Sequence, residues 1–153
     1  MQSEETGALK LAGMSPQDGI PTTSQKQSGA LLAAISNLVV RIYAEHVGRG
    51  PTRARTYFND NVIACVLHDT LIKPERTLLG DGKHETVLRM RIALQEAMRE
   101  ELVSGVEQLT GRKVISFMSG NDLSPDYATE IFVLEASANG NGRQELAPVS
   151  DSA

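Results

Sequence analysis

The stretch RARTYFNDNVIACVL, residues 53–67, decides the fold because it predicts a β-hairpin in the middle of the chain. In residues 53–58, inward-facing residues alternate with two arginines and a tyrosine, which is typical of a half-buried strand. The inward set is Ala54, Thr56 and Phe58. Asn and Asp tolerate left-handed backbone, so residues 59–61 predict a tight turn. Residues 62–67 are apolar at both odd and even positions, whose side chains leave opposite faces of a strand, which indicates a central strand covered on both faces.

Two amphipathic helices are predicted on either side of this hairpin. The first spans residues 28–47, where apolar residues recur at helical spacing up to the stop at Gly48. Ser24 and Gln27 have capping-box spacing, which allows a start one turn earlier. The second spans residues 84–109. The expected buried stripes comprise Leu31, Ile35, Leu38 and Ile42 in the first helix, and Val87, Leu94, Met98, Leu102, Val106 and Leu109 in the second.

Shorter elements complete the expected order α-β-β-(short α)-α-β-β. Residues 73–79 predict a helical turn, and residues 113–119 and 127–135 predict two strands joined by a loop over 120–126. We therefore expect an α+β two-layer sandwich, with a four-stranded, mainly antiparallel sheet and two main helices on one face. Three of the strands are apolar on both parities. A homodimer is the simplest way to cover the second face of the sheet.

Residues 28–136 are expected to form this single domain. Residues 1–27 and 137–153 lack apolar periodicity, so we expect disordered tails there. The N-terminal sequence lacks the apolar region of a secretory signal. No uninterrupted apolar run approaches the length of a spanning helix. We therefore expect a cytoplasmic protein that does not insert into the membrane and is held there, if at all, through a partner.

Composition narrows the function classes. A formal net charge of −4 and 4% aromatic residues argue against a protein that coats nucleic acid or stacks on bases. One cysteine excludes an internal disulfide. Cys65 and His68 are three positions apart on a strand, so their side chains should leave opposite faces. We find no triad, cofactor fingerprint or metal-ligand spacing, and expect no catalytic residues, cofactor or metal.

The most prominent candidate site follows the first helix. It comprises Gly48, Arg49, Gly50, Pro51, Arg53 and Arg55. Arginine forks suit phosphate or carboxylate groups, and glycines expose backbone N–H groups, so the segment could bind an anion or a partner protein. The alternative interpretation is a helix stop followed by a solvated strand face. The segment is not a dinucleotide fingerprint, because it follows a helix and lacks the third glycine.

Three short segments carry a family resemblance. They are Gly48-Arg49-Gly50-Pro51, Leu71-x-Lys73-Pro74-Glu75-x-x-Leu78 and Leu109-Thr110-Gly111-Arg112-Lys113-Val114. In this order and spacing, over about residues 28–136, the chain resembles the small bacterial domain family named for MpsC. That family is described as part of a sodium-translocating, membrane-potential-generating system.

The resemblance implies a non-enzymatic, soluble accessory or regulatory protein whose partner is a membrane transporter subunit. It carries over no catalytic residue. The alternative function is a small nucleic-acid- or anion-binding module that uses residues 48–55, although the acidic composition makes nucleic acid an unfavourable partner.

Overall fold

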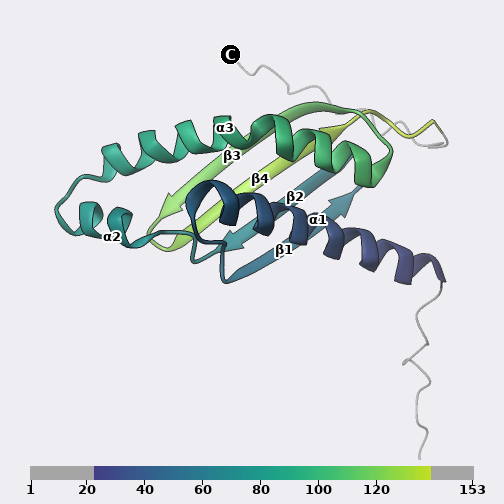
Figure 1. Ribbon diagram of the computed structural model, residues 1–153. Coiled ribbons are helices and arrows are strands. Elements are labelled where there is room, and N and C mark those ends of the chain that lie inside the picture. Colours follow the sequence, from purple (N-terminus) through teal and green to yellow (C-terminus); the bar gives the residue numbers. More distant parts are fainter. Residues whose placement is uncertain (1–22, 139–153) are drawn as a thin grey trace, which may run out of the picture.

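The computed structural model describes residues 23–138, which form three helices and one four-stranded sheet (Figure 1). The elements are α1 (Thr23–Val47), β1 (Arg53–Asn59), β2 (Val62–His68), α2 (Lys73–Gly80), α3 (His84–Thr110), β3 (Val114–Leu123) and β4 (Asp126–Leu134). The predicted α+β fold is confirmed. The expected tails lie almost wholly outside the described residues.

The sheet has the strand order β1-β2-β4-β3, and each neighbouring pair is antiparallel. Its register sorts the side chains into rows that run across all four strands. One such row is Thr56, Cys65, Glu130 and Ser119, and it lies on the side of the helices. The next row towards the hairpin turn is Phe58, Ile63, Phe132 and Phe117.

Both long helices cover the same face of the sheet, α1 over β1 and α3 over β3, and they contact each other (Figure 1). Gly105 of α3 allows this close approach, because a Cβ there would lie 2.6 Å from Cδ2 of Leu38. The core is the layer between helices and sheet. Its fully buried side chains include Ile35, Val39, Ile42, Ile63, Leu67, Met98, Leu102 and Phe132.

Two element bounds differ from the expectation. Helix α1 begins at Thr23, more than one turn before residue 28, so Ser24 lies inside the helix and is not the cap that its spacing to Gln27 suggests. The expected loop over 120–126 is mostly strand. Gly120, Asn121 and Asp122 pair with residues of β4, so only residues 124 and 125 connect the two strands. The side chain of Asn121 bonds to α3, and this tertiary contact outweighs the local turn preference.

Helix α1 bears on the expectation about membrane segments. Residues Ser24–Val47 are long and apolar enough to cross a membrane, with a mean hydropathy of 1.3 over the best 18-residue window. The expectation considered uninterrupted apolar runs, and Ser36, Asn37 and Arg41 do interrupt this helix, but its mean hydropathy still reaches the value of a spanning helix. Length and composition are the whole of this evidence, since core helices of soluble proteins also meet the criterion. Ile35, Val39 and Ile42 of α1 are fully buried in the domain core.

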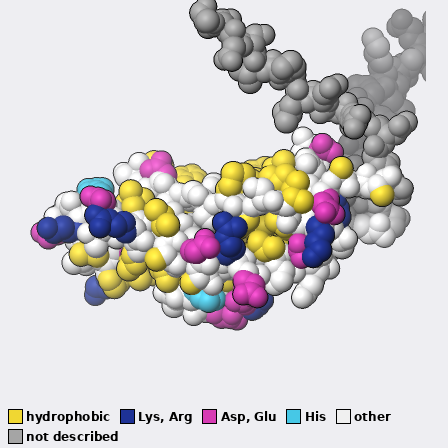
Figure 2. All heavy atoms as spheres, turned by 90° about the horizontal axis from the view of Figure 1, so that it is seen from above, with side chains coloured by type: hydrophobic (Ala, Val, Ile, Leu, Met, Phe, Trp, Pro, Cys, Tyr) yellow, Lys and Arg dark blue, Asp and Glu magenta, His cyan; other side chains and the backbone are white. Residues whose placement is uncertain are grey.

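The surface is a mixture of charged and apolar areas (Figure 2). Exposed large apolar side chains fall into two groups. Ile92, Leu109 and Ile115 belong to α3 and to the outer strand β3. Tyr57, Val62, Met118 and Tyr127 lie on the sheet face that carries no helix, and Tyr57 is 52% exposed. The register thus places apolar side chains on this second face together with charged ones, Arg53, Arg55 and Asp122.

Candidate functional site

The predicted segment 48–55 turns the chain from the end of α1 into β1. Gly48 has φ +85°, a left-handed conformation that ends the helix and disfavours any side chain. A Cβ at Gly50 would lie 3.2 Å from both Cγ1 and the carbonyl oxygen of Val40, so the turn packs closely on α1. Pro51 is buried. Three of the six predicted residues therefore shape the turn.

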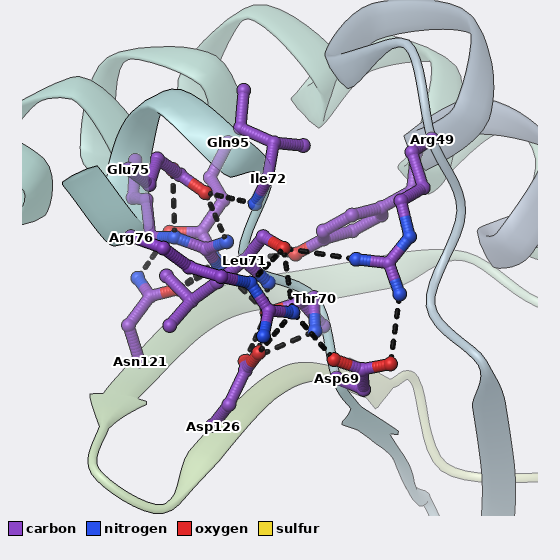
Figure 3. A network of polar contacts seen from close by, with 12 residues as sticks. Arg49, Asp69, Thr70, Leu71, Ile72, Glu75, Arg76, Gln95, Asn121 and Asp126 are labelled. Atoms are coloured by element: carbon purple, nitrogen blue, oxygen red, sulfur yellow. Dashed lines mark hydrogen bonds and ion pairs between the residues drawn. The ribbon is translucent and has the colours of Figure 1, made fainter.

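Arg49 points towards the loop after β2 (Figure 3). Its guanidinium donates to the Leu71 carbonyl oxygen at 2.9 Å and to Asp69 at 2.7 Å. Arg76 of α2 donates to the other oxygen of Asp69, also at 2.7 Å. The hydrogen bonds from Arg76 and Arg49 hold the pKa of Asp69 below its usual range. Arg49 therefore fastens the end of α1 to the start of α2 instead of presenting a free guanidinium.

Arg53 and Arg55 lie elsewhere, on the helix-free face of β1, directly across from His68 and Val66. Within residues 23–138 neither arginine makes an ion pair or a side-chain hydrogen bond. A shallow hollow surrounds them, lined by Arg53, Ala54, Arg55, Tyr57, Val66 and His68. The structure thus divides the predicted site, with Arg49 bound internally and two unpaired arginines on the open face.

A polar network lies beneath Arg49, around residues 69–72 (Figure 3). The Asp126 carboxylate accepts the backbone N–H groups of Thr70 and Leu71, at 3.0 and 2.9 Å, and the Thr70 hydroxyl. This carboxylate holds the segment that leads from β2 into α2. It also brings the start of β4 against the end of β2.

Glu75 and Arg91 form an ion pair in the core of this network. Arg91 of α3 donates through Nε at 3.0 Å and through Nη2 at 2.9 Å, and the Glu75 side chain is fully buried. Glu75 also accepts the Ile72 N–H at 2.8 Å, so it caps the start of α2. Arg91 also donates hydrogen bonds through Nη1 to the Thr70 hydroxyl and to the side-chain oxygen of Asn121. Such a bidentate pair fixes the orientation of α2 on α3.

Glu130 of β4 is the second buried acid, and it lies between the helices and the sheet. Its carboxylate accepts hydrogen bonds from Tyr43 at 2.5 Å and from Gln95 at 3.2 Å, and it contacts the Ser119 hydroxyl. Burial raises the pKa of Glu130 to about 7, and these hydrogen bonds limit the rise. Burial and the neighbouring carboxylate also raise the pKa of Tyr43. Glu130 is therefore a proton-binding group near neutral pH.

The two acids are connected through α3. Gln95 bonds to Tyr43, Glu130 and Asn121, and Asn121 accepts from Arg91. A cavity of about 10 Å³, lined in part by Tyr43, Glu75 and Gln95, lies beside this connection. That is the room of about one water molecule. The network can bind protons and hold elements together, and its cavity is too small for an organic ligand.

Sequence reasoning missed these buried polar residues. Arg91 and Gln95 occupy the positions between Val87 and Met98 on the buried stripe of α3. Glu130 has the same strand parity as the buried Ala128 and Phe132. A polar residue at a position where the periodicity predicts an apolar one was the signal that could have indicated a buried polar group.

Cys65 and His68 do not form a shared site. Cys65 is buried on the helix side of β2, whereas His68 lies on the other face, as the strand spacing predicts. Burial raises the pKa of the Cys65 thiol to about 11. Among the described residues no three His, Cys, Asp or Glu side chains converge on a possible metal position.

Comparison with known proteins identifies the family. The family described as "Na+-translocating membrane potential-generating system (MpsC)" matches residues 27–136, which span all seven elements apart from the first four residues of α1. The chain belongs to the MpsC family. The three resemblance segments lie inside the matched range, and the first and second meet in the structure where Arg49 bonds to Leu71.

One curated relative of this MpsC-family chain is the uncharacterized protein YrhF of Bacillus subtilis (strain 168). It is 22% identical over 102 residues, which cover 65% of this chain and 84% of YrhF. No solved structure matches the chain significantly.

Proposed function

We propose that this chain is a non-enzymatic accessory or regulatory protein of a sodium-translocating, membrane-potential-generating system. The observation that carries the proposal is the family match over the whole folded domain, since the family description names such a system. The family description supports association with such a system. We further propose that the role is accessory, without catalysis, and that the chain acts from the cytoplasm.

The geometry supports action by binding. The buried ionisable groups Glu75, Arg91 and Glu130 are bonded to internal partners, and the cavity beside Glu75 and Arg91 has room for about one water. A catalytic site needs a reacting atom within hydrogen-bond reach of its acid or base. The exposed surfaces, by contrast, offer apolar and cationic side chains to a partner protein.

Sedimentation with membranes tests the proposal. Purified full-length chain is mixed with inside-out vesicles from the native host, with right-side-out vesicles, and with liposomes of the extracted lipid. We expect saturable binding to inside-out vesicles only, because the partner is a membrane protein reached from the cytoplasm. Equal binding to protein-free liposomes would instead indicate insertion through α1 and would refute attachment through a partner.

The second candidate function rests on Arg53 and Arg55, which lack partners among residues 23–138 and share a hollow with Tyr57. Such a surface suits phosphate groups, with a ring available for stacking. Binding of short single-stranded nucleic acid should then weaken with salt and with the double change Arg53→Ala and Arg55→Ala. Unchanged mobility of the oligonucleotide at low salt would reject this candidate.

A further inference from the structure

The helix-free face of the sheet carries a complete pattern of side chains that can be read from the strand register. Four rows cross it. From β1 through β2 and β4 to β3 they read Arg53, His68, Tyr127, Asp122; then Arg55, Val66, Thr129, Gly120; then Tyr57, Ala64, Ile131, Met118; and last Asn59, Val62, Val133, Ser116. The first row has a cation at one end and an anion at the other. Both arginines lie on β1 and the carboxylate lies on β3.

We propose that two copies of this chain dimerise through these faces, related by a two-fold axis that runs parallel to the strands between β2 and β4. Rotation about this axis leaves each row at the same position along the strands and reverses the order of the four strands across it. Residues of β1 therefore face β3 of the second copy, and residues of β2 face its β4. Stacked sheets pack about 10 Å apart, which lets the side chains of the two faces meet.

Each row therefore packs against the same row of the second copy, read in the opposite direction. Arg53 meets Asp122 of the second copy, and His68 meets Tyr127. Large residues meet small ones in the middle rows, Arg55 over Gly120 and Ile131 over Ala64. The remaining pairs are Tyr57 over Met118, Val66 over Thr129, Val62 over Val133 and Asn59 over Ser116.

The charges select this axis over the other in-plane choice. An axis perpendicular to the strands would place β1 over β1 and reverse the rows, so that Arg53 met Asn59 and Asp122 met Ser116. Both Arg53 and Asp122 would then lose their opposite partners, and unpaired charges between packed sheets are costly, whereas Arg55 faces no anion with either axis and does not distinguish the two. Asp122 is available, since only its Oδ1 accepts a hydrogen bond, from the Ser124 N–H, among the contacts of residues 23–138.

Two further observations agree with an occupied face. Four of the seven exposed large apolar residues lie on it: Tyr57, Val62, Met118 and Tyr127. Arg53 has no ion-pair partner within residues 23–138, whereas the exposed Arg41, Arg89 and Arg99 each have at least one. In the proposed dimer, Asp122 of the second copy is the ion-pair partner of Arg53. The proposal goes beyond the proposed function and does not depend on it.

Charge reversal tests the pairing. The full-length protein is measured by light scattering after gel filtration, where a dimer of the 16.5 kDa chain has twice that mass. We expect a dimer for the natural sequence, monomers for Arg53→Asp and for Asp122→Arg, and a restored dimer when both changes are combined. Arg89→Asp, which alters an exposed arginine of α3, is the matched control and should remain dimeric.

A cross-link tests the register independently of stability. Tyr57 and Met118 lie on the two outer strands of one sheet, about 14 Å apart at the usual strand spacing, whereas in the proposed dimer each faces the other residue of the second copy across roughly 10 Å. The double variant Tyr57→Cys and Met118→Cys should therefore form a covalent dimer with a short bis-maleimide that spans the gap between stacked sheets, and neither single variant should. A monomeric natural protein, a dimer that survives both single charge reversals, or a double cysteine variant that stays monomeric would overturn the proposal.

Discussion

Glu130 gives the sharpest prediction about stability. Burial moves its pKa from the ordinary 4.5 to about 7, so the folded state binds a proton more tightly than the unfolded chain does. The free energy of unfolding that this group contributes is then fully present below pH 4.5 and is lost as the pH rises through about 7. The pKa difference corresponds to about 3 kcal/mol, of which about 2 to 3 kcal/mol falls between pH 5 and pH 8.

The test compares the natural protein with Glu130→Gln. The amide oxygen of glutamine can accept from Tyr43 and Gln95 as the carboxylate does, but the side chain does not ionise. Urea unfolding followed by circular dichroism at several pH values should show the variant gaining about 2 to 3 kcal/mol relative to the natural protein between pH 5 and pH 8.

Glu100→Gln removes an exposed carboxylate of α3 and is the control, with a pH profile expected to run parallel to that of the natural protein. Cys65, Tyr43 and Arg91 are the ionisable groups near Glu130 or its hydrogen-bond partner, and all three are kept in both variants. Parallel profiles for Glu130→Gln and the natural protein would refute the reasoning.

Other consequences of the structure are tested by single substitutions. Arg91→Met leaves the Glu75 carboxylate buried without its partner and should lower the unfolding free energy by about 3 to 5 kcal/mol, and adding Glu75→Gln should recover at least half of this loss in the same denaturation assay. Gly111→Ala places a side chain at φ +67° after α3 and should cost about 1 kcal/mol, whereas Gly29→Ala within α1 should not destabilise; a loss of similar size in both would contradict the argument from backbone conformation. The Cys65 thiol should react with a disulfide reagent at pH 8 at least about 100-fold more slowly in the folded protein than in urea, and equal rates would show that the core is open.

Local patterns predicted most of the elements because apolar periodicity and breaker residues are local signals. The hairpin over 53–67 and the second long helix appear where the sequence indicates. Leu109 was expected on the buried stripe and is 40% exposed, because the stripe follows Arg91 and Gln95 towards Val106. The end of β3 was missed because the contacts of Asn121 with α3 are tertiary.

The site was predicted less well, for a physical reason. Arg49, Arg53 and Arg55 are close in sequence, but the turn at Gly48–Pro51 and the strand parity of β1 send Arg49 to the helix layer and the other two to the opposite face. Of the two buried acids, Glu130 could be recognised from its place among the inward-facing apolar residues of β4, whereas Glu75 is the one buried residue of α2 and had no such signal. Their side-chain partners come from three other elements, α1, α3 and β3, which no local pattern connects.

The measurement that tests the central claim most directly is the sodium-driven membrane potential itself. Inside-out vesicles from host cells that lack this chain are loaded with a potential-sensitive dye and energised at defined sodium concentrations, with and without the purified protein. The account predicts a reduced sodium-dependent potential in these vesicles and its recovery on adding the protein, with no change in the sodium-independent potential. A sodium-dependent potential that is the same with and without the chain would contradict it.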